Sequence, residues 1–368
     1  MQARWIPDQV GDDSLHDGGE RPQAFRLMNR LRFSLFFVLA AFAAAPAAAQ
    51  YAGSYARMGF GARGIAMGGG LVADVFAEAS PYYNPALAPR IERQALDAAA
   101  GFLSFDRSLQ HLQFAFPLPP RAGAAVGIVR AGVDNIDGRD NSGFHTDDLS
   151  TEEYVIFAAF GARLSDRVSG GIGLRFYHAD LFEGVDPVVS LGLSLGLAAQ
   201  VSENLAFGLA VNDLLARYQW DTSDAFGDAG TQTTDRFPVR VQFGGAYRLP
   251  AGRGTITAEL ETQVVTVERR TERVSEIGGE PTVFRQNDKL QLSDTRFRLG
   301  GEYWLLEPFG VRVGVDRLGA GGADGISPAA GFAVRQPLGD IAARLDYTAV
   351  LEPYGLGVVH FVALHLDL

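Results

Sequence analysis

Apolar residues occupy every second position in short runs that recur through most of the chain. The run TITAELETQVV at residues 255–265 and the run FGVRVGVD at residues 309–316 both show this alternation. A period of two gives a β-strand one apolar face and one polar or small face. About fourteen runs of strand length follow Pro89, at approximately residues 95–105, 110–118, 122–132, 151–163, 168–179, 188–201, 204–212, 236–248, 254–265, 294–305, 308–317, 326–336, 340–350 and 358–368. We therefore predict an all-β fold.

The connections between these runs alternate in length. One set is short and turn-like, at residues 119–121, 165–167, 202–203, 250–253, 307–308 and 337–339. The other set is mostly long and polar, at residues 133–150, 180–187, 213–235, 266–293, 317–325 and 351–357, with one short member near residues 106–108. Short periplasmic turns and long extracellular loops are typical of outer-membrane barrels.

The length of the strands fits a membrane. About ten tilted residues cross the apolar band of a bacterial outer membrane, and in the run 237–247 we expect Phe237 and Tyr247 on the outer apolar face, at the two edges of that band. A closed sheet also leaves no unpaired backbone groups in lipid. We predict that residues 92–368 form a 14-stranded antiparallel transmembrane β-barrel surrounded by outer-membrane lipid; the alternative is a soluble all-β domain.

The first part of the chain reads as a leader. Arg30 and Arg32 precede an apolar run, residues 33–45, which is followed by the sequence PAAAQ. A basic segment, a short apolar segment and an A-x-A site are the features of a cleavable signal peptide. We predict export with cleavage after Ala49, to the outer membrane of a Gram-negative cell. Met28 is a natural initiator methionine, so we interpret residues 1–27 as an over-long start of the reading frame that precedes the signal peptide.

A glycine-rich segment lies between the leader and the first strand. Residues 58–89 contain too many glycines for a helix of their own and are too irregular for a strand. Asn84-Pro85 forces an extended or turn conformation there. We interpret residues 50–91 as a plug (hatch) inside the barrel. Its candidate motif residues are Gly61, Arg63, Gly64, Met67, Gly68, Gly69, Tyr83, Asn84, Pro85 and Ala86.

Composition excludes several functions. There are no cysteines, so disulfides, thiolate metal sites and cysteine nucleophiles are impossible. A net charge of −11 makes nucleic acid a poor partner. Residues 59–64 match G-x-G-x-x-G, but without the strand and helix of a dinucleotide site. The histidines show no metal-ligand spacing and no Ser/His/Asp grouping is recognisable, so we predict no catalytic or metal site, no cofactor and no enzyme activity.

Charged residues recur on the polar faces of the predicted strands. Those expected to face the lumen are Arg175, Arg240, Glu259, Glu261, Arg298, Glu302, Arg312, Asp316, Arg344 and Asp346. They either line a conduit or form a charge-paired network that holds the plug and fills the barrel. A further acidic stretch at residues 134–140 is either a solvated loop or a source of oxygen ligands for calcium.

The plug segment resembles a known family. Residues 61–69, GARGIAMGG, followed by residues 82–87, YYNPAL, are similar to the N-terminal signature of the PorV/PorQ family, which is related to the FadL-type (OMPP1/FadL/TodX) transporters. Relatives often carry a pair of aspartates before the Tyr-x-Asn-Pro segment, whereas here Asp74 and Glu78 are separated. The resemblance implies a 14-stranded outer-membrane barrel. It further implies either a component of type IX protein secretion or a channel for hydrophobic molecules with a lateral opening, in which Asn84-Pro85 is a movable gate instead of a fixed turn.

Two functions follow from this resemblance. In the first, the chain is a PorV/PorQ-type docking or scaffold component of type IX-like secretion, which binds exported proteins or secretion-system subunits through the loops 213–235 and 266–293. In the second, it is a FadL-like passive transporter of a hydrophobic small molecule. The loop 266–293 is charged and polar, not apolar as a rim that collects hydrophobic ligands should be, which favours the first function.

Overall fold

The computed structural model describes residues 52–277, 280–319 and 325–368. The proposed start at Met28, the signal peptide and its cleavage site at Ala49 lie outside the described residues. Within the described part, no helix has the length and apolarity needed to cross a membrane.

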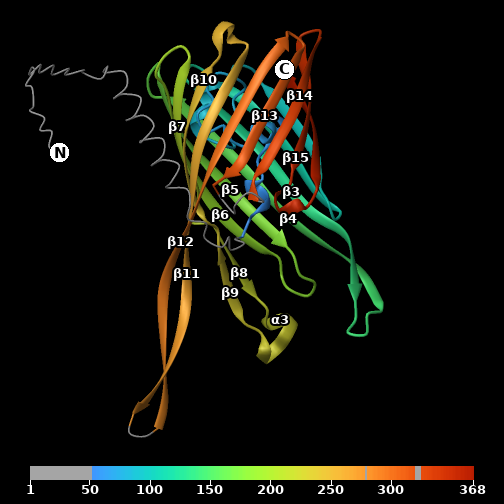
Figure 1. Cartoon of the computed structure of the whole chain (residues 1–368), viewed down its shortest axis with the longest axis vertical. Coiled ribbons are helices and arrows are strands. Elements are labelled where there is room, and N and C mark those ends of the chain that lie inside the picture. The colour runs from blue at the N-terminus through green and yellow to red at the C-terminus, as the bar shows by residue number, and fades with distance from the viewer. Residues whose placement is uncertain (1–51, 278–279, 320–324) are drawn as a thin grey trace, which may run out of the picture. The chain divides into compact units, whose positions relative to one another are not determined.

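Fourteen strands of the described chain close into one antiparallel barrel, which Figure 1 shows from the side. The barrel closes where β1 pairs with both β2 and β16. The predicted 14-stranded barrel is therefore confirmed. The strands are β1 (Ala95–Phe102), β2 (Arg107–Leu118), β3 (Ala122–Arg139), β4 (His145–Arg163), β5 (Val168–Asp180), β6 (Val188–Gln200), β7 (Leu205–Leu214), β10 (Val239–Arg248), β11 (Gly254–Ile277), β12 (Glu280–Leu306), β13 (Phe309–Leu318), β14 (Ser327–Leu338), β15 (Ile341–Leu351) and β16 (Val358–Asp367).

The two faces of the wall differ in the way the alternation requires. On β11, Glu259 and Glu261 are buried inside, whereas Ile256 and Leu260 are exposed outside. On β16, Val362 and Leu364 are exposed and His365 is buried. Because side chains of a strand point alternately to its two faces, every strand presents one row to the lumen and one row to the surroundings.

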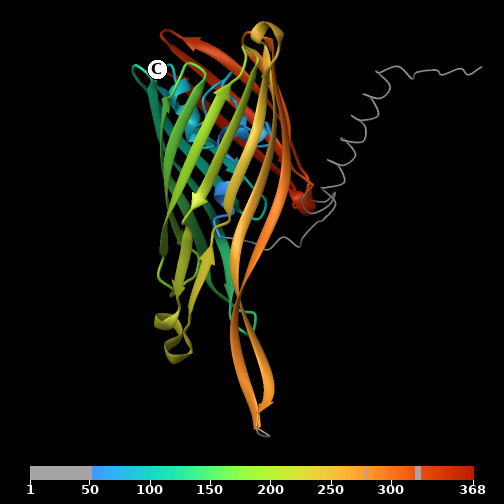
Figure 2. The ribbon, with the colours of Figure 1, turned by 90° about the vertical axis from the view of Figure 1, so that its left-hand side faces the viewer.

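The barrel has two distinct ends. At the end that we call the turn end, short connections join the strands, for example residues 119–121 and 307–308. The opposite loop end carries the long connections, but two of these are not loops. The expected loop 266–293 is wrong, because β11 and β12 stay paired as far as Ile277 and Glu280 (Figure 2), and β3 and β4 likewise stay paired as far as Arg139 and His145. These stretches contain few residues that interrupt strand pairing, and beyond the closed barrel a strand needs no apolar face. The hairpins can therefore continue through polar sequence.

The third long connection, between β7 and β10, folds into a separate hairpin. In it β8 (Arg217–Asp221) pairs with β9 (Gln232–Arg236), and the short helices α3 (Ser223–Phe226) and η3 (Gly227–Ala229) lie between them. Phe237 follows β9 and is only 4% exposed. Its expected place on the outer face is wrong, because β10 begins only at Val239 and the backbone N–H of Phe237 donates to the carbonyl of Ala216, which turns the ring inward.

Residues 52–91, which we call the lumenal segment, contain three short helices: η1 (Tyr55–Arg57), α2 (Gly61–Ala66) and η2 (Pro85–Arg90). Helix α2 contacts β1 and β13–β16, whereas η2 contacts β2–β6. Contacts with strands on opposite sides of a closed wall place this segment inside the barrel.

Candidate functional site

The lumen is the candidate site, and Asn84 is the residue that ties its contents together. The side chain is fully buried. Its Oδ1 accepts a hydrogen bond from the backbone N–H of Ala86 at 3.0 Å and so caps η2, where Pro85 takes the first position. Its Nδ2 donates to the carbonyls of Val72 at 2.7 Å and of Leu197 at 3.1 Å. In this structure Asn84-Pro85 is therefore a capped turn that joins two parts of the lumenal segment to β6.

Inward-facing glycines let the backbone of the lumenal segment lie directly on the wall. A Cβ atom at Gly208 would lie 2.1 Å from the carbonyl oxygen of Val72, and one at Gly314 would lie 2.3 Å from the nitrogen of Gly68. Distances under 3 Å cannot be accommodated without a shift. Similar close approaches occur at Gly123, Gly161, Gly171, Gly196 and Gly300. These glycines leave a trough in the wall that matches the path of the segment.

The motif residues of the lumenal segment also pack against each other. Gly61, Gly68 and Gly69 have φ of +66°, +66° and +76°, which favours glycine. A Cβ at Gly64 would lie 2.3 Å from the hydroxyl of Tyr83, and that hydroxyl accepts from the backbone N–H of Phe60 at 2.8 Å. The G-x-G-x-x-G match at residues 59–64 thus covers the start of a six-residue helix inside a barrel, with no strand before it in the described chain.

One half of the lumen holds a network of paired charges. Arg298 is at its centre, with Nη1 2.7 Å from Glu259 and 2.9 Å from Glu261, and Nε 2.7 Å from Asp316. Arg312 pairs with Glu302 at 2.5 Å and with Asp346 at 2.7 Å. All ten of the charged residues expected in the lumen lie there, and each has an ion-pair partner.

Several members of this network were not expected from the sequence. Asp213 accepts from Arg175 at 3.0 Å and from Arg240 at 2.7 Å. It is the last residue but one of β7, has a φ of +64° and lies within a register shift between β6 and β7, so a regular alternation does not predict its direction. Arg63 of the lumenal segment pairs with Asp74 at 2.6 Å and with Glu302 on β12 at 3.1 Å, which joins segment and wall.

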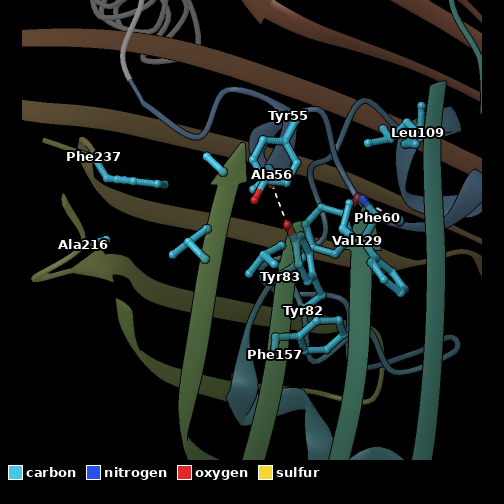
Figure 3. Close-up of a cluster of buried hydrophobic side chains, with 14 of the residues drawn as sticks. Tyr55, Ala56, Phe60, Tyr82, Tyr83, Leu109, Val129, Phe157, Ala216 and Phe237 are labelled. Carbon is cyan, nitrogen blue, oxygen red and sulfur yellow. Dashed lines mark hydrogen bonds between the residues drawn. The ribbon is translucent and has the colours of Figure 1, made fainter. Parts of the chain in front are cut away.

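The other half of the lumen is apolar and aromatic, which the sequence analysis missed. Phe60 stacks on Tyr82 with ring centroids 5.0 Å apart and meets the edge of Phe157 at 5.5 Å (Figure 3). Toward the loop end, Phe237 packs against Tyr177 at 4.5 Å. Other buried members of this aromatic cluster are Tyr55, Leu109, Val129, Val155, Val188, Tyr218, Trp220 and Phe361. The alternation along its strand places Phe157 on the inward face, so its position could have been predicted from the sequence. Trp220 and Tyr218 come from the β8–β9 hairpin, and no sequence pattern indicates that they enter the lumen.

A cavity of about 430 Å³ opens at the turn end of the lumen, between the lumenal segment and strands β1, β2 and β14–β16. Arg335, Arg344, Glu78, Asp97 and His365 are among the residues that line it. The cavity is therefore polar and of mixed charge, in contrast to the aromatic cluster above it.

The acidic stretch 134–140 forms the end of the β3–β4 hairpin. The carboxylate of Asp137 accepts from Nε of Arg139 at 2.8 Å and lies 2.8 Å from Nδ1 of His145. Both hydrogen bonds lower the pKa of Asp137, and the one from His145 has the larger effect. The carboxylate in turn raises the pKa of His145. Oδ1 of Asp140 accepts from the backbone of Ser142 and Phe144. Both carboxylates thus have local partners, and calcium binding by this stretch stays a prediction.

Comparison with known proteins gives a likeness of fold. No family model matches the chain, and no curated protein sequence matches it either. The toluene transporter TodX of Pseudomonas putida has a similar structure, with a TM-score of 0.55 and 14% identity over 84% of this chain and 96% of that one. A FadL homologue of Pseudomonas aeruginosa follows, with a TM-score of 0.52 and 11% identity over 83% of this chain and 97% of that one.

A TodX deletion variant described as a monoaromatic hydrocarbon channel gives a TM-score of 0.53 at 14% identity, over 84% of this chain and 97% of that one. At such identities the likeness establishes the fold, which is the barrel of the FadL and TodX structures. The relation to FadL-type barrels expected from the plug motif is thus supported at the level of fold, whereas the PorV/PorQ resemblance receives no support. The similar structures are a transporter, a channel and a FadL homologue, and none of these three is described as an enzyme.

Proposed function

We propose that the chain is an outer-membrane channel for the passive passage of hydrophobic small molecules. The aromatic cluster in the lumen is the observation that carries this proposal. Barrels that conduct polar solutes have polar, water-filled interiors, whereas here one half of the interior is filled by Phe60, Tyr82, Phe157 and their neighbours. An apolar solute gains free energy by leaving water for such a surface.

The outer face of the barrel supports its place in a membrane. Large apolar side chains are exposed on many strands, among them Phe160, Ile172, Leu191 and Leu345. Soluble monomers rarely expose contiguous apolar patches of more than a few hundred Å². Lipid is the environment in which these rows are stable, with the turn end toward the periplasm and the loop end outside. The lumenal segment, together with residues 50 and 51, is the plug of this channel, followed by the barrel at residues 92–368.

Uptake into liposomes tests the proposal. Barrel-containing liposomes should take up radiolabelled toluene or a medium-chain fatty acid faster than empty liposomes, and a sugar of similar size no faster. Val129→Thr should slow this uptake, since it places a hydroxyl among buried apolar side chains without changing their volume much. Val126→Thr is the matched control, because Val126 lies on the same strand and is exposed on the outer face. Equal uptake by empty and barrel-containing liposomes would refute the channel.

The docking function remains a second candidate because the β11–β12 hairpin reaches well past the barrel wall (Figure 2). A hairpin of polar sequence is suited to contacts with an exported protein or a secretion-system subunit. Deleting residues 267–290 separates the two functions. A channel keeps its uptake of hydrophobic solutes after this deletion, whereas a docking protein loses its partners in a comparison of material co-purified from outer membranes with and without the hairpin.

A further inference from the structure

Four lumenal residues stand side by side in one row across the seam where the barrel closes. Asp97 on β1 is the register partner of His365 on β16 and of Gln113 on β2, and His365 is also the register partner of Arg344 on β15. All four side chains point into the lumen. Glu78 of the lumenal segment meets this row from inside, so the cluster joins the plug to both terminal strands of the barrel.

The geometry around His365 is the unusual feature of this row. Its Nδ1 lies 2.8 Å from Oε1 of Glu78 and 2.7 Å from Oδ1 of Asp97, while its Nε2 lies 3.1 Å from Asp367. One ring nitrogen carries a single proton, so it forms a full hydrogen bond with only one of the two carboxylates. The two carboxylate oxygens therefore converge on one ring nitrogen, and their repulsion is relieved either by a protonated imidazole or by a bound cation.

Three carboxylates, those of Glu78, Asp97 and Asp367, face this one imidazole. The guanidinium of Arg344 contacts Glu78 at 2.5 Å and is shared with Asp346 at 2.9 Å. Next in the row, Gln113 is 3% exposed. Its Nε2 donates to Asp97 at 3.2 Å, and its Oε1 is buried without a hydrogen-bond donor. Because Gln113 is the register neighbour of Asp97 and lines the same cavity as Glu78 and His365, this unpartnered carbonyl oxygen is a further potential ligand for a cation.

We propose that Glu78, Asp97 and His365 bind a divalent cation of the zinc class, with Gln113 as an additional oxygen donor. Their ligand atoms all lie within 4.8 Å of one another. Ligands about 2.0–2.2 Å from zinc are about 3.4 Å apart in a tetrahedral site, so the two carboxylate oxygens, now 2.7 and 2.8 Å from Nδ1 of His365, would move outward by about 0.6–0.7 Å on binding. A neutral imidazole nitrogen with carboxylate oxygens is a donor set that suits Zn²⁺, whereas Ca²⁺ and Mg²⁺ prefer oxygen alone. The cavity at the turn end, which Glu78, Asp97, Gln113 and His365 all line, gives the ion a path from the periplasm.

A cation in this position has a structural consequence. It links residue 78 of the plug to the first and last strands of the barrel, and so stabilises both the seat of the plug and the seam of the wall. Binding stabilises the folded state by mass action, since the three ligands come together only in the folded barrel. This inference is independent of which solute passes through the channel.

Metal binding to the purified barrel tests the site. The full mature chain, carrying no histidine tag, is stripped with EDTA in detergent micelles and titrated with ZnCl₂ by calorimetry. We expect one zinc ion per chain and a higher unfolding temperature with zinc, read from the heat-modifiable band on gels. Cobalt(II) should bind with a visible absorption spectrum, and calcium or magnesium at equal concentration should not displace it.

Substitution of the ligands should remove these effects. His365→Asn and Glu78→Gln should each weaken zinc binding by more than about 100-fold, since the loss of an outer-shell partner alone costs 10–100-fold. Glu78→Gln leaves the barrel wall unchanged and so keeps the test valid if His365→Asn fails to fold. His111→Gln and His145→Ala are the matched controls: His111 is a lumenal histidine whose Nδ1 accepts from Gly61, and His145 is an exposed histidine beside Asp137. No zinc bound by the wild type, or unchanged binding by both ligand variants, would overturn the proposal.

Discussion

Gly300→Ala is expected to loosen the plug without harming the barrel. A Cβ at Gly300 would lie 2.4 Å from the carbonyl oxygen of Met67, whereas ordinary contacts begin at 3.4 Å. The backbone of Met67 must therefore move by about 1 Å. Movement toward β13 is blocked, because the next residue, Gly68, is packed against the backbone of Val315 so closely that a Cβ there would lie 2.6 Å from its oxygen. The new methyl group would also lie 2.8 Å from Oγ1 of Thr257 on β11, a wall hydroxyl that can rotate away.

The size of the effect follows from this overlap. Overpacking by one methyl group in a tightly packed site costs about 1–3 kcal/mol. If the barrel wall holds its shape, this cost falls on the docking of the plug, and the undocked population rises by about 5- to 150-fold at 1.4 kcal/mol per factor of ten. Cleavage by trypsin after Arg63, which is buried in the docked plug, reports this population.

The neighbouring Gly301 provides the control. Its Cβ would point outward, with Val313 Cγ2 at 3.9 Å as its nearest contact. Gly301→Ala should therefore be cleaved at the wild-type rate, and both variants should keep the heat-modifiable mobility of a folded barrel. Equal cleavage rates for Gly300→Ala, Gly301→Ala and the wild type would refute the reasoning that the wall glycines hold the plug in place.

Two further outcomes are expected. Asn84→Ala removes the acceptor for Ala86 and the donors to Val72 and Leu197, at a cost of about 1–3 kcal/mol per stranded buried group, so trypsin cleavage of the plug should accelerate. Asn84→Asp should accelerate it at least as much, because it keeps the acceptor but turns a second carboxylate oxygen toward the carbonyl oxygens of Val72 and Leu197 at a buried site. Unchanged cleavage in both variants would show that the cap is dispensable. Asp137→Asn should return the raised pKa of His145 toward its ordinary value in a histidine NMR titration. In the wild type the ion pair stabilises the folded hairpin only at pH values between the lowered pKa of Asp137 and the raised pKa of His145. Below this range acid protonates the carboxylate, and above it base removes the imidazole proton. An identical titration curve for His145 in the variant would contradict this coupling.

The barrel could be predicted from the sequence because its strands alternate strictly between apolar and polar residues. Apolar residues such as Ile256 and Leu260 alternate with Glu259 and Glu261, and this alternation set both the number of strands and the face of each charge. The alternation is lost in the long hairpins that continue past the closed barrel. There the pairing of β11 and β12 as far as Ile277 and Glu280 appears in the sequence only as a polar stretch, so it was interpreted as a loop.

The contents of the lumen were harder to predict because they depend on residues that meet only in three dimensions. Glu78, Asp97 and His365 come from the plug, the first strand and the last strand, and no spacing in the sequence relates them. Phe237 has the apolar character of a membrane-facing residue, yet it packs against Tyr177 and Tyr218 inside. The alternation of apolar and polar residues predicts which face of a strand a side chain lies on. It makes no prediction for Phe237, which precedes the first residue of its strand.

The charge network indicates that the wall does not depend on the plug. Glu302 pairs with Arg63 of the plug but also with Arg312 of the wall, and Arg344 pairs with Glu78 but also with Asp346. Arg63 likewise keeps Asp74 as a partner within the plug itself. Removing one partner of a buried ion pair costs several kcal/mol when it strands the other charge, and neither wall residue would be stranded here. The electrostatic cost of undocking is thus small for these wall charges. The plug is therefore held by its close backbone packing on the wall glycines, by the hydrogen bond of Asn84 to Leu197, by the aromatic contacts with Phe157 and by the cluster around His365.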